Sequence, residues 1–164
     1  MDIICDIDGT LMNVEARRQL AVKMKGKYDK KMNWDVFLDP QNMLALDTPN
    51  WDVVNVIKKL KTDNKDTIIF TSARNERHRQ ATLAQIEKRC LISMTLTRYS
   101  EQGNRLYLRA DDDFRPDDIT KKELYEQIVR DGFKPELAFD DRDQVVKMWR
   151  ELGLPCYQVR AGDF

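Results

Sequence analysis

The chain has 164 residues, a length that suits one domain with a sizeable buried core. Apolar residues make up 41% of it, which excludes an intrinsically disordered chain. Lys and Arg total 28, as do Asp and Glu, so the net charge is zero. This balance argues against a generally basic nucleic-acid coat and still allows local basic patches.

Cysteine content and hydropathy bear on the cellular compartment. The three cysteines, Cys5, Cys90 and Cys156, are odd in number and widely spaced, a pattern typical of reduced thiols in the cytosol. No apolar run reaches membrane-spanning length, and the first strand begins too early to leave room for a signal peptide. We therefore predict a cytoplasmic protein with no membrane contact, of unknown oligomeric state.

The first half of the chain predicts a strand and several helices. Residues 2–6 read as a buried strand. Residues 11–47 read as irregular, with one helix over 14–25 and a short one near Trp34 and Phe37. Thr48 is the expected N-cap of the next helix, with Pro49 at its first position.

The second half alternates between strands and helices. Residues 67–70 form a second buried strand that ends at Thr71-Ser72. The remaining predicted elements are a polar helix over 75–89, short strands near 93–96 and 106–108, a helix from Asp117, a strand over 136–139 that ends on Asp140-Asp141, a helix over 144–152 and a strand over 156–159.

This alternation predicts an α/β fold whose parallel sheet is covered by helices on both faces. Ligands of such sheets bind beyond the carboxyl ends of the strands. Three predicted strands end on polar side chains: Asp6 and Asp8, Ser72, and Asp140 with Asp141. In parallel strands these ends share one edge. In the alternative, each acid only caps the helix that follows it. Capping could account for a single acidic strand end, but it accounts poorly for three polar strand ends together.

Four motifs resemble those of the haloacid dehalogenase superfamily: "DIDGT", "FTSAR", "DDITKK" and "LAFDDRDQVV". The C-terminal stretch "DDRDQVVKMWRELGLPCYQVRAGDF" is similar to the C-terminal phosphatase domain of phage polynucleotide kinase/3′-phosphatases. The similarity covers residues 1–17, 66–75 and 100–164. It implies a Rossmann-like single domain over 1–164 with a small helical cap inserted at about 11–48, although the segment 18–48 departs from that family.

The resemblance implies a phosphatase reaction in two steps. Asp6 is the expected nucleophile, which forms an aspartyl phosphate. Asp8 is the expected general acid and base, which protonates the leaving oxygen and then activates water. The crowded carboxylates require a cation, and Mg²⁺ fits them because it prefers oxygen ligands. By resemblance Asp6, the main-chain carbonyl of Asp8 and Asp141 hold it, and Asp140 is the weaker candidate.

Two positions required a choice between neighbours. Ser72 precedes a small residue and Arg74, the spacing of the second motif, so it is preferred over Thr71 as the catalytic hydroxyl. Lys121 shares a helix face with apolar residues and should point inward, whereas Lys122 is rotated off that stripe.

The remaining site residues concern the substrate. By resemblance Arg17 and Arg74 contact its phosphate, a role that suits the guanidinium fork, although Arg18 is an alternative to Arg17. Thr10 and Asp117 are further candidates for substrate binding, and Asp117, one turn before Lys121, could instead position that lysine. His78 is expected on a solvated helix face.

Three functions remain open. The first is a Mg²⁺-dependent phosphatase acting on 3′-phosphate ends of DNA or RNA, with a basic, aromatic-bearing cap segment that grips the strand. The second is a phosphatase of free nucleotides or other small phosphomonoesters. The third is a non-catalytic binding module, disfavoured by the complete motif set. The sequence contains no P-loop, so no kinase activity of that type is expected in it.

Overall fold

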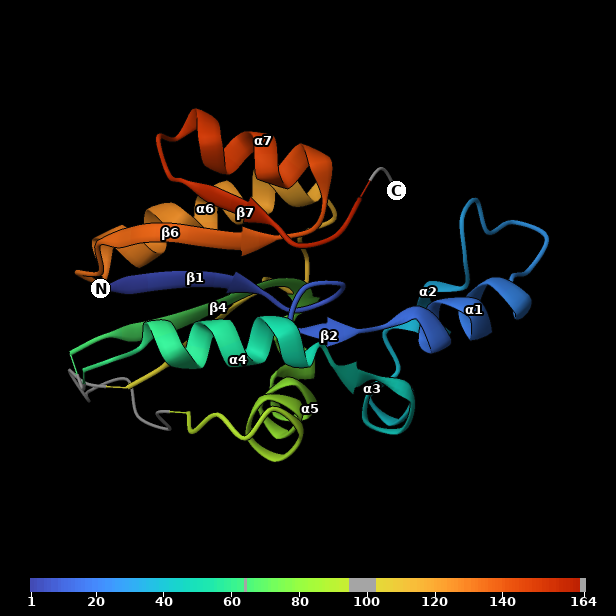
Figure 1. Ribbon diagram of the computed structural model, residues 1–164. Helices are drawn as coiled ribbons and strands as arrows, with labels where there is room; N and C mark the ends of the chain where they lie inside the picture. The colour runs from blue at the N-terminus through green and yellow to red at the C-terminus, as the bar shows by residue number, and fades with distance from the viewer. Residues whose placement is uncertain (64, 95–102, 163–164) are drawn as a thin grey trace.

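A computed structural model describes residues 1–63, 65–94 and 103–162. Its centre is a five-stranded sheet in which every neighbouring pair is parallel, in the order β5-β4-β1-β6-β7 (Figure 1). The strands are β1 (Asp2–Asp6), β4 (Thr67–Asn75), β5 (Arg105–Arg109), β6 (Pro135–Asp140) and β7 (Cys156–Gln158). The predicted α/β fold with a parallel sheet is therefore confirmed.

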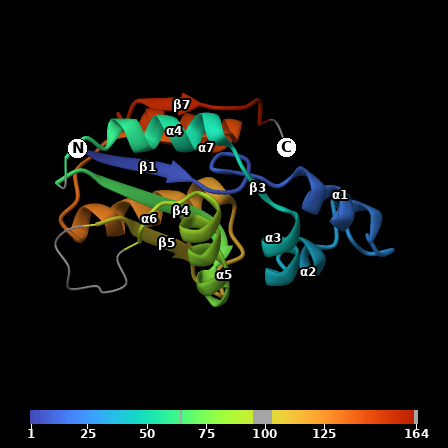
Figure 2. The ribbon, with the colours of Figure 1, turned by 60° about the horizontal axis from the view of Figure 1, so that its bottom comes forward.

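Helices cover both faces of the sheet. On one face α4 (Trp51–Leu60) and α5 (Arg79–Ala84) lie over the side chains of Ile3 and Cys5. On the other, α6 (Asp117–Arg130) and α7 (Asp143–Glu151) lie over Ile4. Figure 2 shows α5 in front of the sheet and α6 behind it. Burial of alternate strand residues on opposite faces follows from the two-residue period of the strand.

A helical segment extends beyond that edge. It contains α1 (Glu15–Lys23), α2 (Trp34–Phe37) and α3 (Pro40–Leu46) (Figure 1). Its two connections to the sheet pair with each other as the antiparallel strands β2 (Met12–Asn13) and β3 (Thr48–Pro49). Helix α3 is a difference from the sequence prediction: the Asp39 side chain accepts a hydrogen bond from the Gln41 N–H, and Pro40 occupies the first turn.

The predicted helix start at Thr48 is wrong. Thr48 and Pro49 are extended in β3, and α4 follows Asn50. The Asn50 side chain donates a hydrogen bond of 2.7 Å to the Thr10 carbonyl, and its backbone N–H donates to Leu11. These contacts hold the segment against the turn after β1, so tertiary pairing overrides the local capping signal.

The polar helix predicted over 75–89 consists of three pieces. A 3₁₀ turn over Glu76–His78 precedes α5, and a π-helical turn over Gln85–Arg89 follows it. Of the strand predicted near 93–96, Met94 makes an isolated bridge with Asn104, and residues 95 and 96 lie outside the described ranges. The other predicted strands and helices agree with the structure to within a few residues.

No helix within the described residues combines the length and the apolar character that a membrane span requires. The three cysteines are free and buried.

Candidate active site

The carboxyl edge of the sheet brings acids from two neighbouring strands together. Asp6 ends β1 and Asp140 ends β6, with Asp141 next in the chain. Carboxylate oxygens of these three residues lie within 4.8 Å of one another, and all three side chains are buried. The predicted convergence of Asp6 with Asp140 and Asp141 on one edge is confirmed, whereas the predicted end at Ser72 is wrong, because β4 continues to Asn75.

Lys121 neutralises part of this negative charge. Its Nζ donates hydrogen bonds of 2.7 Å to Asp6 Oδ1 and 2.8 Å to Asp140 Oδ2. Burial alone would lower the pKa of Lys121, but the two carboxylates outweigh it and raise that pKa well above its usual range. Lys121 is buried and Lys122 exposed, as the helix periodicity predicts.

Asp140 has no free acceptor position toward the solvent. Its Oδ2 accepts from Lys121 and from the Trp149 indole N–H at 3.1 Å. Its Oδ1 accepts from the backbone N–H groups of Asp141 and Arg142 at 3.0 and 3.3 Å. These four donors hold the Asp140 carboxylate in one orientation.

The carboxylates of Asp6 and Asp141 accept fewer hydrogen bonds than that of Asp140. Asp6 Oδ2 is buried and accepts no hydrogen bond from the residues the structure describes. Burial, with Asp140 and Asp141 beside it, raises the pKa of Asp6 despite Lys121. Burial and the adjacent Asp140 likewise raise the pKa of Asp141 to about 6. Three buried carboxylates with one lysine leave negative charge and free oxygens, the donor set that suits Mg²⁺.

Two buried arginines surround Asp8. The Arg17 Nη2 lies 2.5 Å from Asp8 Oδ1, and Arg74 donates from Nη2 and Nε at 2.6 and 2.9 Å. Burial would raise the pKa of Asp8, but Arg74 and Arg17 outweigh it and hold that pKa well below its usual range. The resemblance implied Arg17, with Arg18 as the alternative, and Arg17 is the one whose side chain is fully buried.

The structure leaves the choice between Ser72 and Thr71 open. Ser72 Oγ accepts a hydrogen bond of 3.2 Å from the Arg74 backbone N–H. Thr71 Oγ1 is buried without a partner among the described residues. Thr10 lies near the acids, with its Oγ1 3.5 Å from Asp141 Oδ1.

Asp117 and His78 differ from expectation in their surroundings. Asp117 pairs with Arg109 and Arg142 rather than with Lys121. His78 is only 8% exposed, so the expectation of a solvated face is wrong. His78 is the last residue of the 3₁₀ turn before α5, so its direction does not follow the α-helical period that the prediction assumed.

Two residues of this region were missed by the sequence analysis. Asp47 accepts from Arg17 Nε at 2.8 Å, and Gln85 Oε1 accepts from Arg74 Nη1 at 2.6 Å. Neither belongs to a recognisable motif, and their partners are 30 and 11 positions away in the chain. No local sequence signal could have identified them.

Gly9 allows the turn after β1 to approach Asp141. Its φ is +90°, and a Cβ there would lie 2.1 Å from Asp141 Oδ2. Gly132 has a similar φ of +95° but no atom within 4 Å of its Cβ position. Both Gly→Ala changes should carry the left-handed backbone cost of roughly 1–2 kcal/mol.

Gly9→Ala should therefore lower the free energy of unfolding by more than Gly132→Ala, because it also displaces the Asp141 carboxylate. Urea denaturation of both variants measures the difference. Equal losses would contradict the close approach of the turn to Asp141.

Comparison with known proteins gives one family. Residues 37–164 match the family model HAD_PNKP, the polynucleotide kinase PNKP phosphatase domain. The chain is 28% identical over 153 residues to a protein of Autographa californica nuclear polyhedrosis virus. That protein is named "Putative bifunctional polynucleotide kinase/RNA ligase". That match covers 93% of this chain and 18% of the viral protein.

Two solved structures are similar over 99% of the chain. A chain in the structure of the Pnkp1/Rnl/Hen1 RNA repair complex is 31% identical with a TM-score of 0.68, and 43% of it is covered. A chain in a second Pnkp1/Rnl/Hen1 complex is 32% identical with a TM-score of 0.70, and 46% of it is covered. The chain thus spans less than half the length of each of these relatives. The family match agrees with the cluster of Asp6, Asp140 and Asp141 and with the inward direction of Lys121. The chain belongs to the PNKP phosphatase-domain family of haloacid dehalogenase phosphatases.

Proposed function

We propose that this chain removes a terminal 3′-phosphate from DNA or RNA through an aspartyl phosphate on Asp6. The observation that carries the proposal is the environment of Asp6: its Oδ1 is fixed by Lys121, while its buried Oδ2 accepts no hydrogen bond from the described residues. A carboxylate held on one oxygen and free on the other can act as an oriented nucleophile. Membership of a phosphatase-domain family and likeness to chains from an RNA repair complex support the choice of reaction and substrate.

The proposed reaction has two displacements. Asp6 forms a bond to phosphorus as the bond to the substrate's 3′ oxygen breaks. Asp8 is ionised while Arg17 and Arg74 hold it, so it first takes up a proton from solvent when these arginines turn toward the phosphate, and it then gives that proton to the leaving oxygen. Asp8 then takes a proton from water as the water oxygen attacks the phosphoaspartate. Inorganic phosphate leaves, and Asp6 regains its carboxylate.

The surrounding residues bind the phosphate and shape the site. We assign the phosphoryl oxygens to Arg17, Arg74 and the hydroxyl of Ser72, with Thr71 as its alternative. Thr10 lies beside Asp141, and Asp117 acts through its two arginine partners rather than through Lys121.

Asp6, Asp141 and the main-chain carbonyl of Asp8 are the proposed ligands of Mg²⁺. Asp140 is the weaker candidate because both of its oxygens already accept hydrogen bonds. When bound, Mg²⁺ would offset the negative charge shared by the carboxylates and the phosphate.

A substrate panel tests this function. It compares kcat/KM for 3′-phosphorylated DNA and RNA oligonucleotides, 3′-mononucleotides, 5′-mononucleotides and an aryl phosphate, each with Mg²⁺ and with EDTA. We expect the 3′-phosphorylated oligonucleotides to be the best substrates and EDTA to abolish turnover. A preference for free mononucleotides, or full activity in EDTA, would overturn the polynucleotide or the metal assignment respectively.

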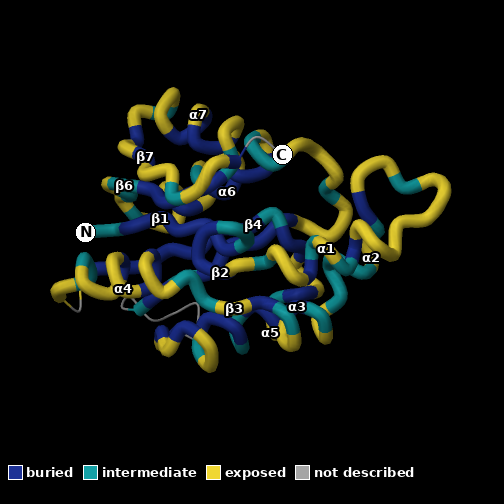
Figure 3. Tube along the Cα trace, turned by 45° about the vertical axis from the view of Figure 1, so that its right-hand side comes forward, coloured by how far each residue is buried: buried dark blue, intermediate teal, exposed yellow. Residues whose placement is uncertain are grey.

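A basic stretch in the helical segment beyond the carboxyl edge of the sheet favours a polynucleotide over a free nucleotide as the substrate (Figure 1). This lysine segment, residues 23–33, contains five lysines and one aspartate in a chain of zero net charge. Within the described part of the chain these lysines form no ion pair, and Tyr28 is 91% exposed beside Lys27. Figure 3 shows the stretch between α1 and α2 as a mostly exposed loop. The segment lies outside residues 37–164, which the family model matches.

Replacing Lys23, Lys25 and Lys27 with Gln should raise KM for a 3′-phosphorylated oligonucleotide about tenfold. Loss of three phosphate contacts should also reduce the slope of log KM against log salt by about 2. Hydrolysis of an aryl phosphate, which cannot reach the segment, should be nearly unchanged. Steady-state kinetics at several salt concentrations measure both effects.

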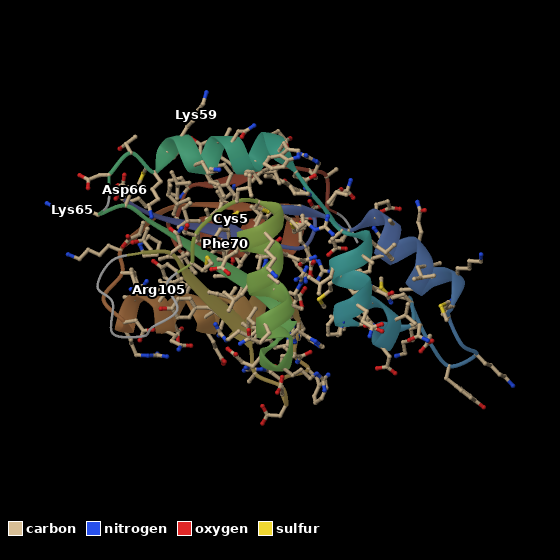
Figure 4. All side chains as sticks on the ribbon, turned by 90° about the horizontal axis from the view of Figure 1, so that it is seen from below. Cys5, Lys59, Lys65, Asp66, Phe70 and Arg105 are labelled. Atoms are coloured by element: carbon tan, nitrogen blue, oxygen red, sulfur yellow. The ribbon has the colours of Figure 1, made fainter. Side chains whose placement is uncertain are left out.

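A matched control replaces Lys59, Lys122 and Lys147 with Gln, since these exposed lysines lie on other helices. Figure 4 shows Lys59 directed away from the molecule on α4. If both triple variants behave alike, the lysine segment is a solvated surface and the small-substrate function gains support.

A further inference from the structure

The two arginines that surround Asp8 are also held from their other side. Arg17 comes from α1 and Arg74 from the end of β4, yet both guanidinium groups reach Asp47. Arg17 Nε lies 2.8 Å from Asp47 Oδ1, and Arg74 Nη2 lies 3.4 Å from Asp47 Oδ2. Each guanidinium therefore spans two carboxylates.

Gln85 completes this arrangement. Its Oε1 accepts from Arg74 Nη1 at 2.6 Å, and its Nε2 donates to Asp47 Oδ2 at 2.9 Å and to the Met43 carbonyl at 2.6 Å. The amide thus orients Asp47 and Arg74 together and ties both to the end of α3.

Asp8 and Asp47 differ in burial, and this difference limits what each carboxylate can contact. The side chain of Asp8 is 22% exposed, whereas that of Asp47 is fully buried. Asp8 can meet a substrate at the edge of the sheet, and Asp47 can act only through the arginines. The charges of Arg17 and Arg74 are balanced by those of Asp8 and Asp47. Each arginine therefore keeps an ion pair with Asp47 when its contact with Asp8 is lost.

We infer that Asp47, oriented by Gln85, is a positioning residue that holds Arg17 and Arg74 ready for the substrate phosphate. Arginine side chains lose considerable rotamer freedom when they bind, and prior orientation lowers that cost at the moment of binding. In the proposed reaction Asp8 moves protons, so an arginine held by Asp8 alone would lose its anchor during turnover. The inference rests on the proposed function for what the arginines bind.

The test compares Asp47→Asn with the wild-type protein, using inorganic phosphate as a competitive inhibitor. Asn keeps the shape of Asp47 and removes its charge. We expect the inhibition constant and KM to rise about tenfold, the scale of one charge-assisted hydrogen bond. A purely structural role would lower the active fraction, and hence the maximal rate, without changing the inhibition constant.

Two further variants keep the inference falsifiable. Gln85→Glu added to Asp47→Asn returns a negative charge one side chain away and should recover much of the phosphate affinity. Gln85→Met alone removes the amide that orients Asp47 and Arg74, and it should weaken phosphate binding about threefold.

The matched control is Asp66→Asn, which removes another buried carboxylate, at the amino-terminal edge of the sheet (Figure 4). It should lower the melting temperature and leave phosphate affinity unchanged. An unaltered inhibition constant in Asp47→Asn, or an equal rise in Asp66→Asn, would overturn the inference.

Calorimetric titration with inorganic phosphate makes the same comparison without turnover. If the wild type binds phosphate and hydrolyses no 3′-phosphorylated oligonucleotide, the proposed substrate is wrong, and the effect of Asp47→Asn on phosphate affinity still decides the positioning role.

Discussion

Asp6→Asn should reduce kcat for a 3′-phosphorylated oligonucleotide by on the order of 10⁴-fold or more, because an amide cannot form the proposed aspartyl phosphate. The fold should survive, since Lys121 keeps its second partner, Asp140, at 2.8 Å. Acid quenching of a reaction with phosphate-labelled substrate should trap label on the wild-type protein and none on the variant.

The same strand supplies a control. Asp2 begins β1 at the opposite edge of the sheet, where its Oδ2 accepts a hydrogen bond from the Lys134 backbone N–H. Asp2→Asn should leave kcat within about twofold of wild type, as is usual for changes remote from a site. Comparable activity in Asp6→Asn and wild type would remove Asp6 as the nucleophile.

Lys121→Ala should lower kcat about 10²- to 10³-fold, the range observed when one donor to a developing negative charge is removed. It also leaves Asp6 and Asp140 facing each other without their shared cation, so the free energy of unfolding should fall by about 3–5 kcal/mol. Kinetics and urea denaturation of the same preparation separate the two effects.

Lys122→Ala changes the next residue of α6, which is exposed. Its free energy of unfolding should stay within about 0.5 kcal/mol of wild type, and its kcat should be unaffected. Lys121→Arg keeps the positive charge but changes the geometry of the donor. A low kcat in this variant, if it is folded, would show that the donor geometry matters in addition to the charge. Equal losses in Lys121→Ala and Lys122→Ala would show that the inward face of α6 does not serve the reaction.

The sequence predicted the acidic edge because its physical basis is local. Asp6 and Asp140 each end a run of apolar residues, and parallel pairing alone then places both at one edge. The inward direction of Lys121 follows from the period of the helix in the same way. In each case a few consecutive residues contain the information.

The partners of Arg17 and Arg74 could not be predicted because they depend on how α3 and the π-helical turn pack. Asp47 precedes a Thr-Pro pair that resembles a helix start, and its actual role as an acceptor arises only when β2 pairs with β3. His78 was misplaced for a similar reason, because it ends a 3₁₀ turn and does not lie in the continuous α-helix that the sequence pattern indicated. Contacts between separate elements determine these positions.

The crowding of Asp6, Asp140 and Asp141 around one lysine has an evolutionary consequence. Like charges buried within 4.8 Å oppose folding, so neutralising one of them, as in Asp141→Asn, should stabilise the metal-free protein while harming the reaction. Mutational drift in a lineage that no longer needs the reaction would therefore erode this cluster quickly, toward a more stable and inactive fold.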